Sequence, residues 1–418
     1  MFSENEFDES GFATAIGRMY ERPDDRQPSG RARVGRTGCT VVLGGGTGGL
    51  VTARELRRRL SADHRVVLVD REREHVFQPS LLWQMVGARR PSQFSRPLDR
   101  LERKGIEFTN AEVRSLDLDA RVVDTTAGAL EYDSLVVSLG ARLAPEEVRG
   151  LDEDVHNLYT AEGCARIHTA LSELREGVVG ILIPELPYKC PAAPYEAAFL
   201  AESYIRGKGV RRDVEIHVFT PEHTPMPVAP AKLGESVEEM MASRGIHFHP
   251  LFTFEERRPE TREIVASDGR AHRIDLLIVV PPHRAPDVVR SSPLLGLSGF
   301  VHVDPRTLQT DVDDVYAIGD VATIKLPNGK ALPKAGVFAH AEAKTVARRI
   351  ARSAAGEAPD AEFEGHGYCW IELGDGRAAF AGGDFYADPE PRITLRRPGR
   401  ALHWGKVGFE KWWLHHWL

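Results

Sequence analysis

Short apolar blocks alternate with glycine turns and amphipathic stretches along most of the chain. An apolar strand at 40–43 leads into a glycine turn, the helical pattern LVTARELRRRL and a second apolar strand, RVVLVD. Strands that are apolar along their whole length are typical of parallel sheets covered on both faces, and this order is that of a βαβ unit. The apolar strand in YDSLVVSLGARLAP ends in a further glycine turn at Gly140. The first region therefore predicts an α/β fold.

The same alternation begins again near Val155. It predicts a strand, a helix in AEGCARIHTALSELREG, a strand in VVGILIP, a helix after Pro194 and a strand in VEIHVFTPE. The segments DLLIVVPP and VDPRTLQTDVDDVYAIGD then lead back toward the first region, and HAEAKTVARRIARSA predicts a helix. After the linker SAAGEAPDAEFEG, the segment GYCWIELGDGRAAFAGG predicts a hairpin that turns at Gly374 to Gly376.

These patterns predict two Rossmann-like dinucleotide-binding domains and a small C-terminal α+β unit. The first domain is expected to be split between 38–150 and 305–350, the second to cover 151–304, and the C-terminal unit to cover 351–418. Residues 1–37 mix charged residues, Pro and Gly without an apolar segment, so they predict a disordered extension and not a secretory signal. No run approaches the roughly 18 apolar residues of a membrane span. We expect the protein to lie on the cytoplasmic side of the cell membrane and to contact the membrane only peripherally.

Composition narrows the classes of function. Of 418 residues, 42% are hydrophobic and 28% charged, as in a globular protein. The formal net charge of -7 argues against nucleic acid as the main partner, because phosphate binding relies on clustered Lys and Arg. Four cysteines are too few for a disulfide framework, so they are buried fillers or a small number of reactive thiols. No metal site is predicted.

Gly44, Gly46 and Gly49 form a GxGxxG motif between a strand and a helix. The first glycine permits a tight turn, the second lets the backbone approach a pyrophosphate, and the third allows close helix packing. Asp70 ends the next strand, 21 residues after Gly49, where an acid can accept hydrogen bonds from a ribose. The motif predicts a dinucleotide site, with NAD and FAD both open, made by Gly44, Gly45, Gly46, Gly48, Gly49 and Asp70.

A second element, DVYAIGD at 314–320, favours FAD. It delivers Gly319 and Asp320 at the end of an apolar strand, like the second motif of two-dinucleotide-domain flavoproteins, in which the acid binds the ribityl chain. Lys334, in LPKAG, is where this architecture brings a cation to the flavin N1 and C2 carbonyl, and such a charge would stabilise the reduced anion. The alternative for DVYAIGD is an ordinary strand that ends in a turn. The alternative for Lys334 is a solvated surface lysine.

The second domain lacks the glycine turn that a nicotinamide dinucleotide needs. IPELPYKC fills its place, and because proline removes an NH group and side chains add bulk, we expect poor NADH binding. Cys190 ends this turn beside Lys189 and before a helix that starts near Ala193 or Pro194. That position biases a thiol moderately toward thiolate. Cys369, in GYCWIEL, is the best candidate for a second redox thiol.

The chain resembles the sulfide:quinone oxidoreductases and the related flavin subunits of flavocytochrome c sulfide dehydrogenases. The resemblance covers about residues 40–418 and rests on GGGTGGL, VFQPSLLW, PYKCPAAPYE, YAIGD, LPKAG, GYCWIE and GKVGFEKWW. It implies FAD as the cofactor, with Pro79 and Gly140 in its binding site, and a redox pair of Cys190 and Cys369 with the acid Glu196 on the following helix. It further implies that sulfide attacks a disulfide or polysulfide bridge between the two cysteines and that two electrons pass through FAD to an acceptor.

Two features depart from the family pattern. Tyr159 takes the place of a third cysteine that many members have, and Cys164, five residues later, is expected to be a buried small hydrophobe. Histidines often found near the sulfide channel of the family are missing near Gly163 and Pro227. The sulfur product is therefore left open. Cys39 is expected in the core.

Four of the six tryptophans lie in HWGKVGFEKWWLHHWL, from His403 onward. A helical pattern spreads its apolar residues over most of the surface, with Trp404, Val407, Leu414 and Leu418 on one side and Phe409, Trp412, Trp413 and Trp417 over much of the other. We expect monotopic attachment to a membrane, with a quinone channel beside Trp412 and Trp413. An internal or dimer-interface tail is the alternative, so homo-oligomer formation stays open.

The leading hypothesis is a peripheral membrane flavoenzyme that oxidises sulfide and reduces quinone. One alternative is a type 2 NADH:quinone oxidoreductase, which the missing second glycine turn disfavours. Another is a sulfide dehydrogenase that passes electrons to a cytochrome, which the lack of an export signal disfavours. A flavin-bearing redox sensor or scaffold is a third.

Overall fold

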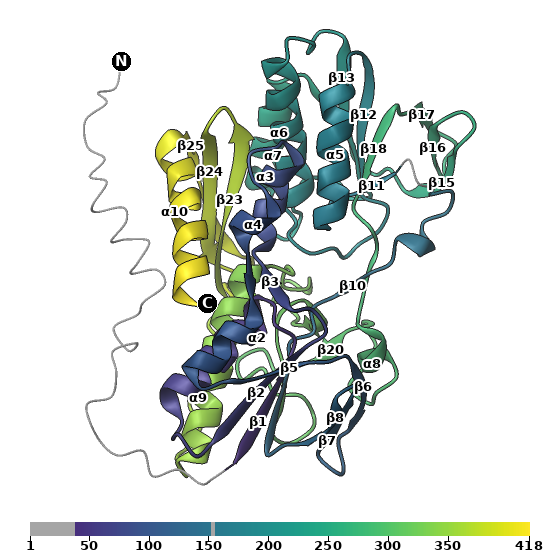
Figure 1. The fold of residues 1–418 in the computed structure, drawn as a ribbon. Helices are drawn as coiled ribbons and strands as arrows, with labels where there is room; N and C mark the ends of the chain where they lie inside the picture. The colour runs from purple at the N-terminus through teal and green to yellow at the C-terminus, as the bar shows by residue number, and fades with distance from the viewer. Residues whose placement is uncertain (1–37, 152–154) are drawn as a thin grey trace.

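The computed structural model describes residues 38–151 and 155–418, which form two α/β units and a smaller C-terminal unit (Figure 1). The extension predicted over 1–37 lies outside the described residues. The predicted fold class, two Rossmann-like parts with a small C-terminal α+β unit, is confirmed. The domain boundaries stay predictions.

A five-stranded parallel sheet forms the centre of the first unit, in the order β21-β9-β1-β2-β5. Its inner strands are buried on both faces, which is why they read as continuous apolar blocks. Helices α2 (Thr47–Arg59) and α9 (Gly336–Ala354) pack against each other beside it. Its strands are β1 (Cys39–Leu43), β2 (Arg65–Asp70), β5 (Glu107–Asn110), β9 (Ser134–Val137) and β21 (Val315–Ala317).

Smaller elements surround this sheet. The helical ones are η2 (Gln78–Ser80), α3 (Leu81–Met85), α4 (Pro91–Phe94), η3 (Leu98–Lys104), η4 (Pro145–Glu147), α8 (Asp287–Arg290) and η5 (Gly319–Val321). The paired strands are β3 (Glu74–Val76) with β4 (Ser95–Pro97), β20 (Val301–His302) with β22 (Ala322–Thr323), and the meander β6 (Val113–Asp117), β7 (Val122–Thr125) and β8 (Gly128–Glu131). The chain passes between the two α/β units through β10 (Arg142–Leu143) and β19 (His283–Arg284), which pair antiparallel.

The second unit repeats the parallel arrangement, in the order β11-β18-β12-β13-β14. The strands are β11 (His156–Asn157), β12 (Gly177–Leu182), β13 (Val214–Phe219), β14 (Ile246–His249) and β18 (Leu276–Val279). The helices are α5 (Ala161–Glu173), α6 (Ala193–Gly207) and α7 (Ala231–Ala242). An antiparallel sheet of β15 (Phe254–Arg258), β16 (Glu263–Ala266) and β17 (Ala271–Arg273) closes a separate small core with β12, β13 and β18.

The C-terminal unit is an antiparallel sheet covered by one helix. Its elements are β23 (His366–Gly374), β24 (Arg377–Asp384), β25 (Arg392–Gly399) and α10 (Arg400–His416), the last drawn in yellow in Figure 1. The predicted hairpin turn is confirmed, because Gly374, Asp375 and Gly376 join β23 to β24 with φ of 75°, 55° and 63°. β23 packs against α6, so the C-terminal unit contacts the second unit directly.

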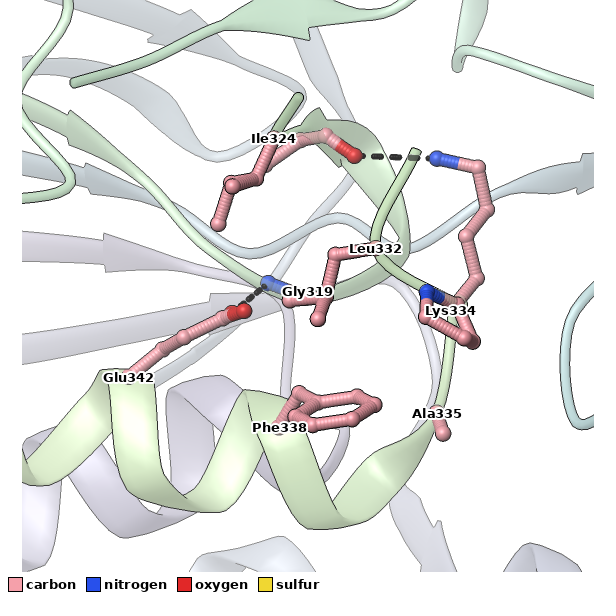
Figure 2. Close-up of a pocket in the computed structure, with 9 residues that line it drawn as sticks. Gly319, Ile324, Leu332, Lys334, Ala335, Phe338 and Glu342 are labelled. Atoms are coloured by element: carbon pink, nitrogen blue, oxygen red, sulfur yellow. Dashed lines mark hydrogen bonds between the residues drawn. The ribbon is translucent and has the colours of Figure 1, made fainter. Parts of the chain in front are cut away.

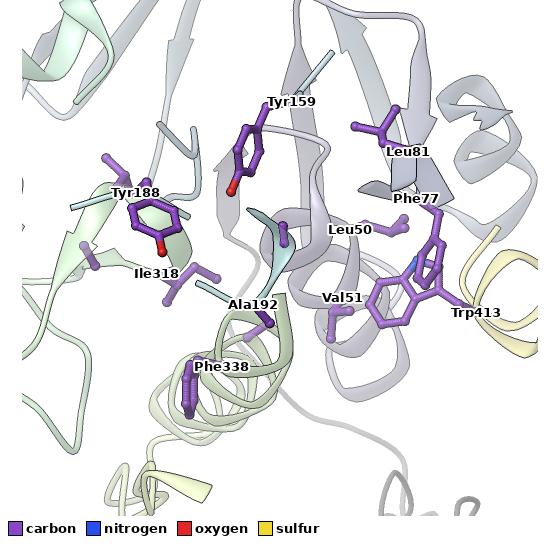
Figure 3. Close-up of a cluster of buried hydrophobic side chains, with 14 of the residues drawn as sticks. Leu50, Val51, Phe77, Leu81, Tyr159, Tyr188, Ala192, Ile318, Phe338 and Trp413 are labelled. Atoms are coloured by element: carbon purple, nitrogen blue, oxygen red, sulfur yellow. The ribbon is translucent and has the colours of Figure 1, made fainter. Parts of the chain in front are cut away.

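One large core joins all three parts. Figure 3 shows Leu50 and Val51 of α2 in the same cluster as Tyr159 and Tyr188 of the second unit and Trp413 of α10. Side chains from distant parts of the sequence therefore meet where the three units join. Across 38–151 and 155–418, none of the helices has both the length and the apolar character that crossing a bilayer requires.

Candidate functional site

The first glycine turn has the shape that a phosphate-binding turn needs. Gly44 adopts a φ of 98°, and a Cβ there would clash with the backbone of Ser138, while a Cβ on Gly49 would clash with the Gly44 carbonyl. Gly46 faces open space and caps α2, whose first turn carries no acidic residue. Because the NH groups and dipole of a helix N-terminus attract anions, this turn is suited to a pyrophosphate.

Asp70 lies beside this turn at the end of β2. One carboxylate oxygen accepts a hydrogen bond from the Gly45 NH, and the other accepts one from the Glu72 NH at 2.7 Å. Burial raises the pKa of Asp70, against the two NH groups, which lower it. Asp70 thus lies where the sequence predicts it, next to the glycines with which it would bind the same ligand.

The predicted cofactor residues gather along one edge of the first sheet. Gly44 follows β1, Gly140 follows β9 and Gly319 follows β21, and all these strands run parallel. Gly140 and Gly319 adopt φ of 68° and 72°, which favour glycine. The carboxyl edge of a parallel sheet is the usual place for a dinucleotide. Pro79, which lies exposed in η2, and Lys334, which lies just before α9, are outside these strand ends.

A small pocket lies where η5 meets the start of α9, with Gly319, Lys334, Phe338 and Glu342 in its wall (Figure 2). The Lys334 ammonium donates hydrogen bonds to the carbonyls of Asp320 and Ala322, at 2.7 and 2.9 Å. Lys334 is only 8% exposed, so the alternative of a solvated surface lysine is wrong.

Glu342, on α9, is a buried acid that the sequence reasoning missed. It accepts a hydrogen bond from the Gly319 NH at 2.6 Å. Burial raises its pKa to about 7, with the Gly319 NH opposing, and burial lowers the pKa of Lys334 to about 8 against the charge of Asp320. The available signal was an acid inside the apolar stripe of α9, between Ala339 and Ala343.

These features fit a flavin dinucleotide. The turn at Gly46 offers an anion site, and the strand end at Gly319 offers a second approach beside a buried cation, Lys334. A positive charge at such a place suits the part of a flavin that becomes negative on reduction.

Cys190 is tied to the cofactor side of the molecule by its backbone. Its NH donates to the carbonyl of Lys334 at 2.6 Å. Its φ is 51°, in the left-handed region, where a residue other than glycine costs roughly 1 to 3 kcal/mol unless its surroundings hold it. The helix that follows, α6, begins at Ala193 as predicted.

Cys369 lies on β23, as predicted, and β23 packs against α6, the helix that follows Cys190. Burial raises the pKa of Cys190 to about 12, with Glu196 adding to the rise and Lys406 opposing it. Burial also raises the pKa of Cys369, to which Cys190 and Glu196 contribute and which Lys406 again opposes. Both cysteines are free, and although each residue as a whole is half-buried, its thiol lies on the buried side. Two cysteines far apart in sequence therefore share one electrostatic environment.

The expected bias of Cys190 toward thiolate is wrong for the free thiols. A helix N-terminus is worth only about 0.3 to 1 kcal/mol at an exposed site, and burial outweighs it here. The charges with the largest effects on this pKa are those of Glu196, which raises it, and Lys406, which lowers it. Near pH 7 the thiol of Cys190 is protonated.

A buried ion pair stands beside the thiols. The ammonium of Lys406, on α10, donates to the carboxylate of Glu196, on α6, at 2.6 Å, and the side chains are 6% and 2% exposed. Burial alone would lower the pKa of Lys406, but Glu196 and Glu372 outweigh burial and raise it. Lys406 was missed as a site residue, and the available signal was a lysine within the apolar pattern GKVGFEKWW.

Further polar groups extend this pair toward the surface. The NH of Glu372 donates to Glu196 at 2.9 Å, and the Glu372 carboxylate contacts Nδ1 of His403 at 3.0 Å. Glu372 is fully buried, whereas the side chain of His403 is 22% exposed. A chain of polar groups thus runs from the ion pair to the edge of α10.

α10 is also fastened to the first unit. Glu410, which is fully buried, accepts hydrogen bonds from Ser80 at 2.6 Å and from Arg89 at 3.0 Å. Trp83 is near both cations, with Lys406 5.3 Å and Arg89 4.7 Å from its ring centre. One helix therefore contacts both α/β units through charged groups.

The other cysteines lie outside this environment. Cys164 is fully buried on α5 and donates to the Leu158 carbonyl at 3.2 Å, so the expectation of a buried small hydrophobe is confirmed. Cys39, expected in the core, is instead half-buried, because it is the first residue of β1 at the sheet end. Tyr159 donates to the carbonyl of Lys189 at 2.7 Å, next to the Cys190 turn.

The tryptophans of the tail divide between core and surface. Trp413 and Trp417 are each 2% exposed, and the Trp413 indole donates to His75 at 3.1 Å. Trp404 is 67% exposed and Trp412 is half-buried. A quinone channel beside Trp412 and Trp413 stays a prediction, although Trp413 itself is packed in the core.

Comparison with known proteins places this geometry among flavoenzymes. The family model described as Pyridine nucleotide-disulphide oxidoreductase matches residues 39–183 and 193–344. The chain is 29% identical to the mitochondrial sulfide:quinone oxidoreductase of Mus musculus, over 84% of this chain and 78% of that one. The solved structure of the sulfide:quinone oxidoreductase from Aquifex aeolicus is similar with a TM-score of 0.81 and 26% identity, over 90% of each chain.

A type II NADH:quinone oxidoreductase of Haemophilus influenzae is 25% identical, over 74% of this chain and 79% of that one. The resemblance to sulfide:quinone oxidoreductases seen in the sequence motifs is confirmed by these comparisons.

Proposed function

Because the chain belongs to the pyridine nucleotide-disulphide oxidoreductase family and is a flavin-dependent oxidoreductase, we propose that it oxidises sulfide and reduces a membrane quinone. The observation that carries the proposal is the packing of β23, which carries Cys369, against α6, which follows Cys190 and carries Glu196, with the charges of Glu196 and Lys406 acting on both thiols. The relatives whose names state sulfide and quinone support these two substrates.

FAD is the proposed cofactor, and when bound it supplies a two-electron acceptor between the thiols and the quinone. The turn at Gly46 would hold the pyrophosphate and Asp70 a ribose. Asp320 would hold the ribityl chain, and Lys334 would face the part of the ring that becomes negative on reduction. Support comes from the open space at Gly46 and the burial of Lys334.

The proposed reaction starts from a disulfide between Cys190 and Cys369. Hydrosulfide attacks one sulfur, the S–S bond breaks, and the products are a persulfide on one cysteine and a thiolate on the other. Removal of two electrons then joins the persulfide sulfur to the thiolate, which gives a trisulfide bridge and releases one proton. The quinone takes up the two electrons and two protons to become a quinol, and further sulfide can attack the longer bridge.

The pair of Glu196 and Lys406 suits this chemistry. Burial raises the pKa of both thiols, so a thiolate set free by the attack needs a positive partner. Lys406 lowers the pKa of each thiol and is itself held in the charged form by Glu196 and Glu372. In the proposal Lys406 therefore stabilises the leaving thiolate, and Glu196 positions Lys406.

Membrane contact is proposed through α10 on the cytoplasmic side. Trp404, which is 67% exposed, supports this contact, because indole rings favour the membrane interface. Quinone would enter from the lipid near this helix.

The competing function is NADH oxidation, which the name of the Haemophilus influenzae relative suggests. The turn from Pro184 to Pro191 speaks against it, because three prolines remove NH groups where a pyrophosphate would bind. Anaerobic bleaching of the bound flavin by sulfide and by NADH distinguishes the two functions. We expect rapid bleaching by sulfide alone. Bleaching by NADH alone would overturn the proposal, and bleaching by neither would favour a redox sensor or scaffold.

Serine variants test the cysteine pair. Cys190→Ser and Cys369→Ser should each retain the flavin absorbance and lose sulfide-dependent bleaching, because neither can form the bridge. Cys164→Ser, which changes a buried thiol on α5, is the control and should bleach normally. Normal bleaching in either pair variant would refute the proposed bridge.

A further inference from the structure

Four histidines and a glutamate gather on the second unit, and none of them belongs to the site described above. Glu215 and His217 come from β13, His247 and His249 from β14, and His272 from β17. His217 is the register partner of His247, so their side chains leave the same face of the sheet. Strand register therefore places the residues of β13 and β14 on one face of the parallel sheet, and His272 joins them from the small antiparallel sheet.

The contacts within this group are close. Nε2 of His217 lies 3.0 Å from the Glu215 carboxylate, and Nδ1 of His217 lies 2.9 Å from Nε2 of His249. The rings of His217 and His247 stack with their centres 4.6 Å apart. Three ligand atoms lie within 4.8 Å of one another, one each from Glu215, His217 and His247.

We infer that Glu215, His217 and His247 form a binding site for a divalent transition-metal ion of the class that prefers imidazole, of which Zn²⁺ is the test case. Imidazole nitrogens suit zinc, copper and nickel, and two histidines with one carboxylate are a known zinc donor set. Three protein ligands leave a fourth position for water.

The spread of the ligand atoms is compatible with such an ion after small rotations. Zinc bonds of 2.0 to 2.2 Å in a tetrahedral site place ligand atoms about 3.3 Å apart, which is less than the present limit of 4.8 Å. Glu215 and His247 are exposed, so both can rotate inward, while the half-buried His217 holds the centre.

His249 supplies the outer support that zinc histidines usually have. A metal-bound histidine commonly donates its other NH to a neighbour, which fixes its ring. Here His217 can bind the ion through Nε2 while Nδ1–H donates to His249. His249 is itself held between Phe219 and His272, whose ring centres lie 4.4 and 4.8 Å away.

Calorimetric titration of the flavin-loaded full chain with Zn²⁺ tests the site. A Cys190→Ser/Cys369→Ser background removes the two thiols that would compete for the ion. We expect one Zn²⁺ per chain, and at least a tenfold loss of affinity in His217→Gln/His247→Gln. His249→Gln should weaken binding about tenfold, as expected for an outer-shell partner. His302→Gln, which changes an exposed histidine on β20, is the matched control and should bind as the parent does.

Co²⁺ absorption gives a second measurement, since a four-coordinate nitrogen and oxygen site has an intense visible band without a thiolate band. If His217→Gln does not fold, Glu215→Gln replaces it, because the Glu215 side chain is 66% exposed and its change leaves the packing intact. Unchanged Zn²⁺ affinity in the folded variants, or no binding at 100-fold excess of the metal over the chain, would overturn the inference.

Discussion

At the scale of the residue, burial sets the chemistry of the proposed redox centre. The thiols of Cys190 and Cys369 are hard to ionise because they are shielded from water, and Lys406 is the nearby cation that opposes this effect on both. The ion pair of Lys406 and Glu196 is buried on both sides, so each partner depends on the other.

Removing this cation should therefore destabilise the fold. We expect Lys406→Met to lower the free energy of unfolding by about 3 to 5 kcal/mol, because it leaves the charge of Glu196 buried without a partner. Urea denaturation measures the loss. Lys411→Met, on the same helix with a side chain 58% exposed, should change stability by less than about 0.5 kcal/mol. Adding Glu196→Gln to Lys406→Met should recover most of the loss, and a double variant no better than the single one would contradict this account.

Glu342 gives a prediction about pH. Its pKa rises from 4.5 to about 7 on burial, so between these values the unfolded chain releases a proton that the folded chain keeps. Stability is thus lost as pH rises through this window, and the loss is complete above about pH 7. Glu342→Gln should be more stable than the parent by about 1 to 3 kcal/mol at pH 8 and equal to it near pH 4. Thermal unfolding at both pH values checks this, with the exposed Glu390→Gln as control. An equal gain at both pH values would point to packing instead of ionisation.

At the scale of the element, α10 has one face packed in the core and another face exposed to solvent. Trp413 packs in the core, and Trp404, nine residues earlier, faces outward. We expect Trp413→Ala to cost about 3 to 5 kcal/mol of stability, as other large-to-small core substitutions do. Trp404→Ala should leave the melting temperature unchanged and reduce cosedimentation with phospholipid vesicles. If Trp404→Ala binds vesicles as the parent does, the proposed membrane contact belongs to another surface.

At the scale of the whole molecule, the sequence predicts individual helices and strands better than the contacts between them. Val-rich blocks such as β1 and β12 are recognisable because a strand buried on both faces is apolar throughout. Neither the pairing of Glu196 with Lys406 nor the grouping of His217 with His247 could be predicted, since both depend on how separate elements pack. The expectation of a lowered pKa for Cys190 is wrong for the same reason. The sequence shows the helix that follows Cys190, but it does not show how deeply the thiol is buried.

The proposed bridge would also act on the molecule as a whole. A disulfide between Cys190 and Cys369 closes a loop of about 180 residues, for which chain entropy gives roughly 5 kcal/mol of stabilisation. The oxidised parent should therefore melt at a higher temperature than the dithiothreitol-reduced parent, as scanning calorimetry can measure. Cys369→Ser should show no such difference. A redox-dependent shift that persists in Cys369→Ser would mean that another group is responsible.

The pairing of Lys406 with Glu196 also has a consequence for biosynthesis. The lysine follows the glutamate by 210 residues, which at typical ribosomal speeds is a delay of roughly 10 to 40 s. During that interval the nascent second unit has to keep an acid without its counter-ion, either protonated or in contact with water. The proposed redox centre is therefore completed only after the C-terminal unit has been synthesised, when the two parallel sheets have already had time to fold.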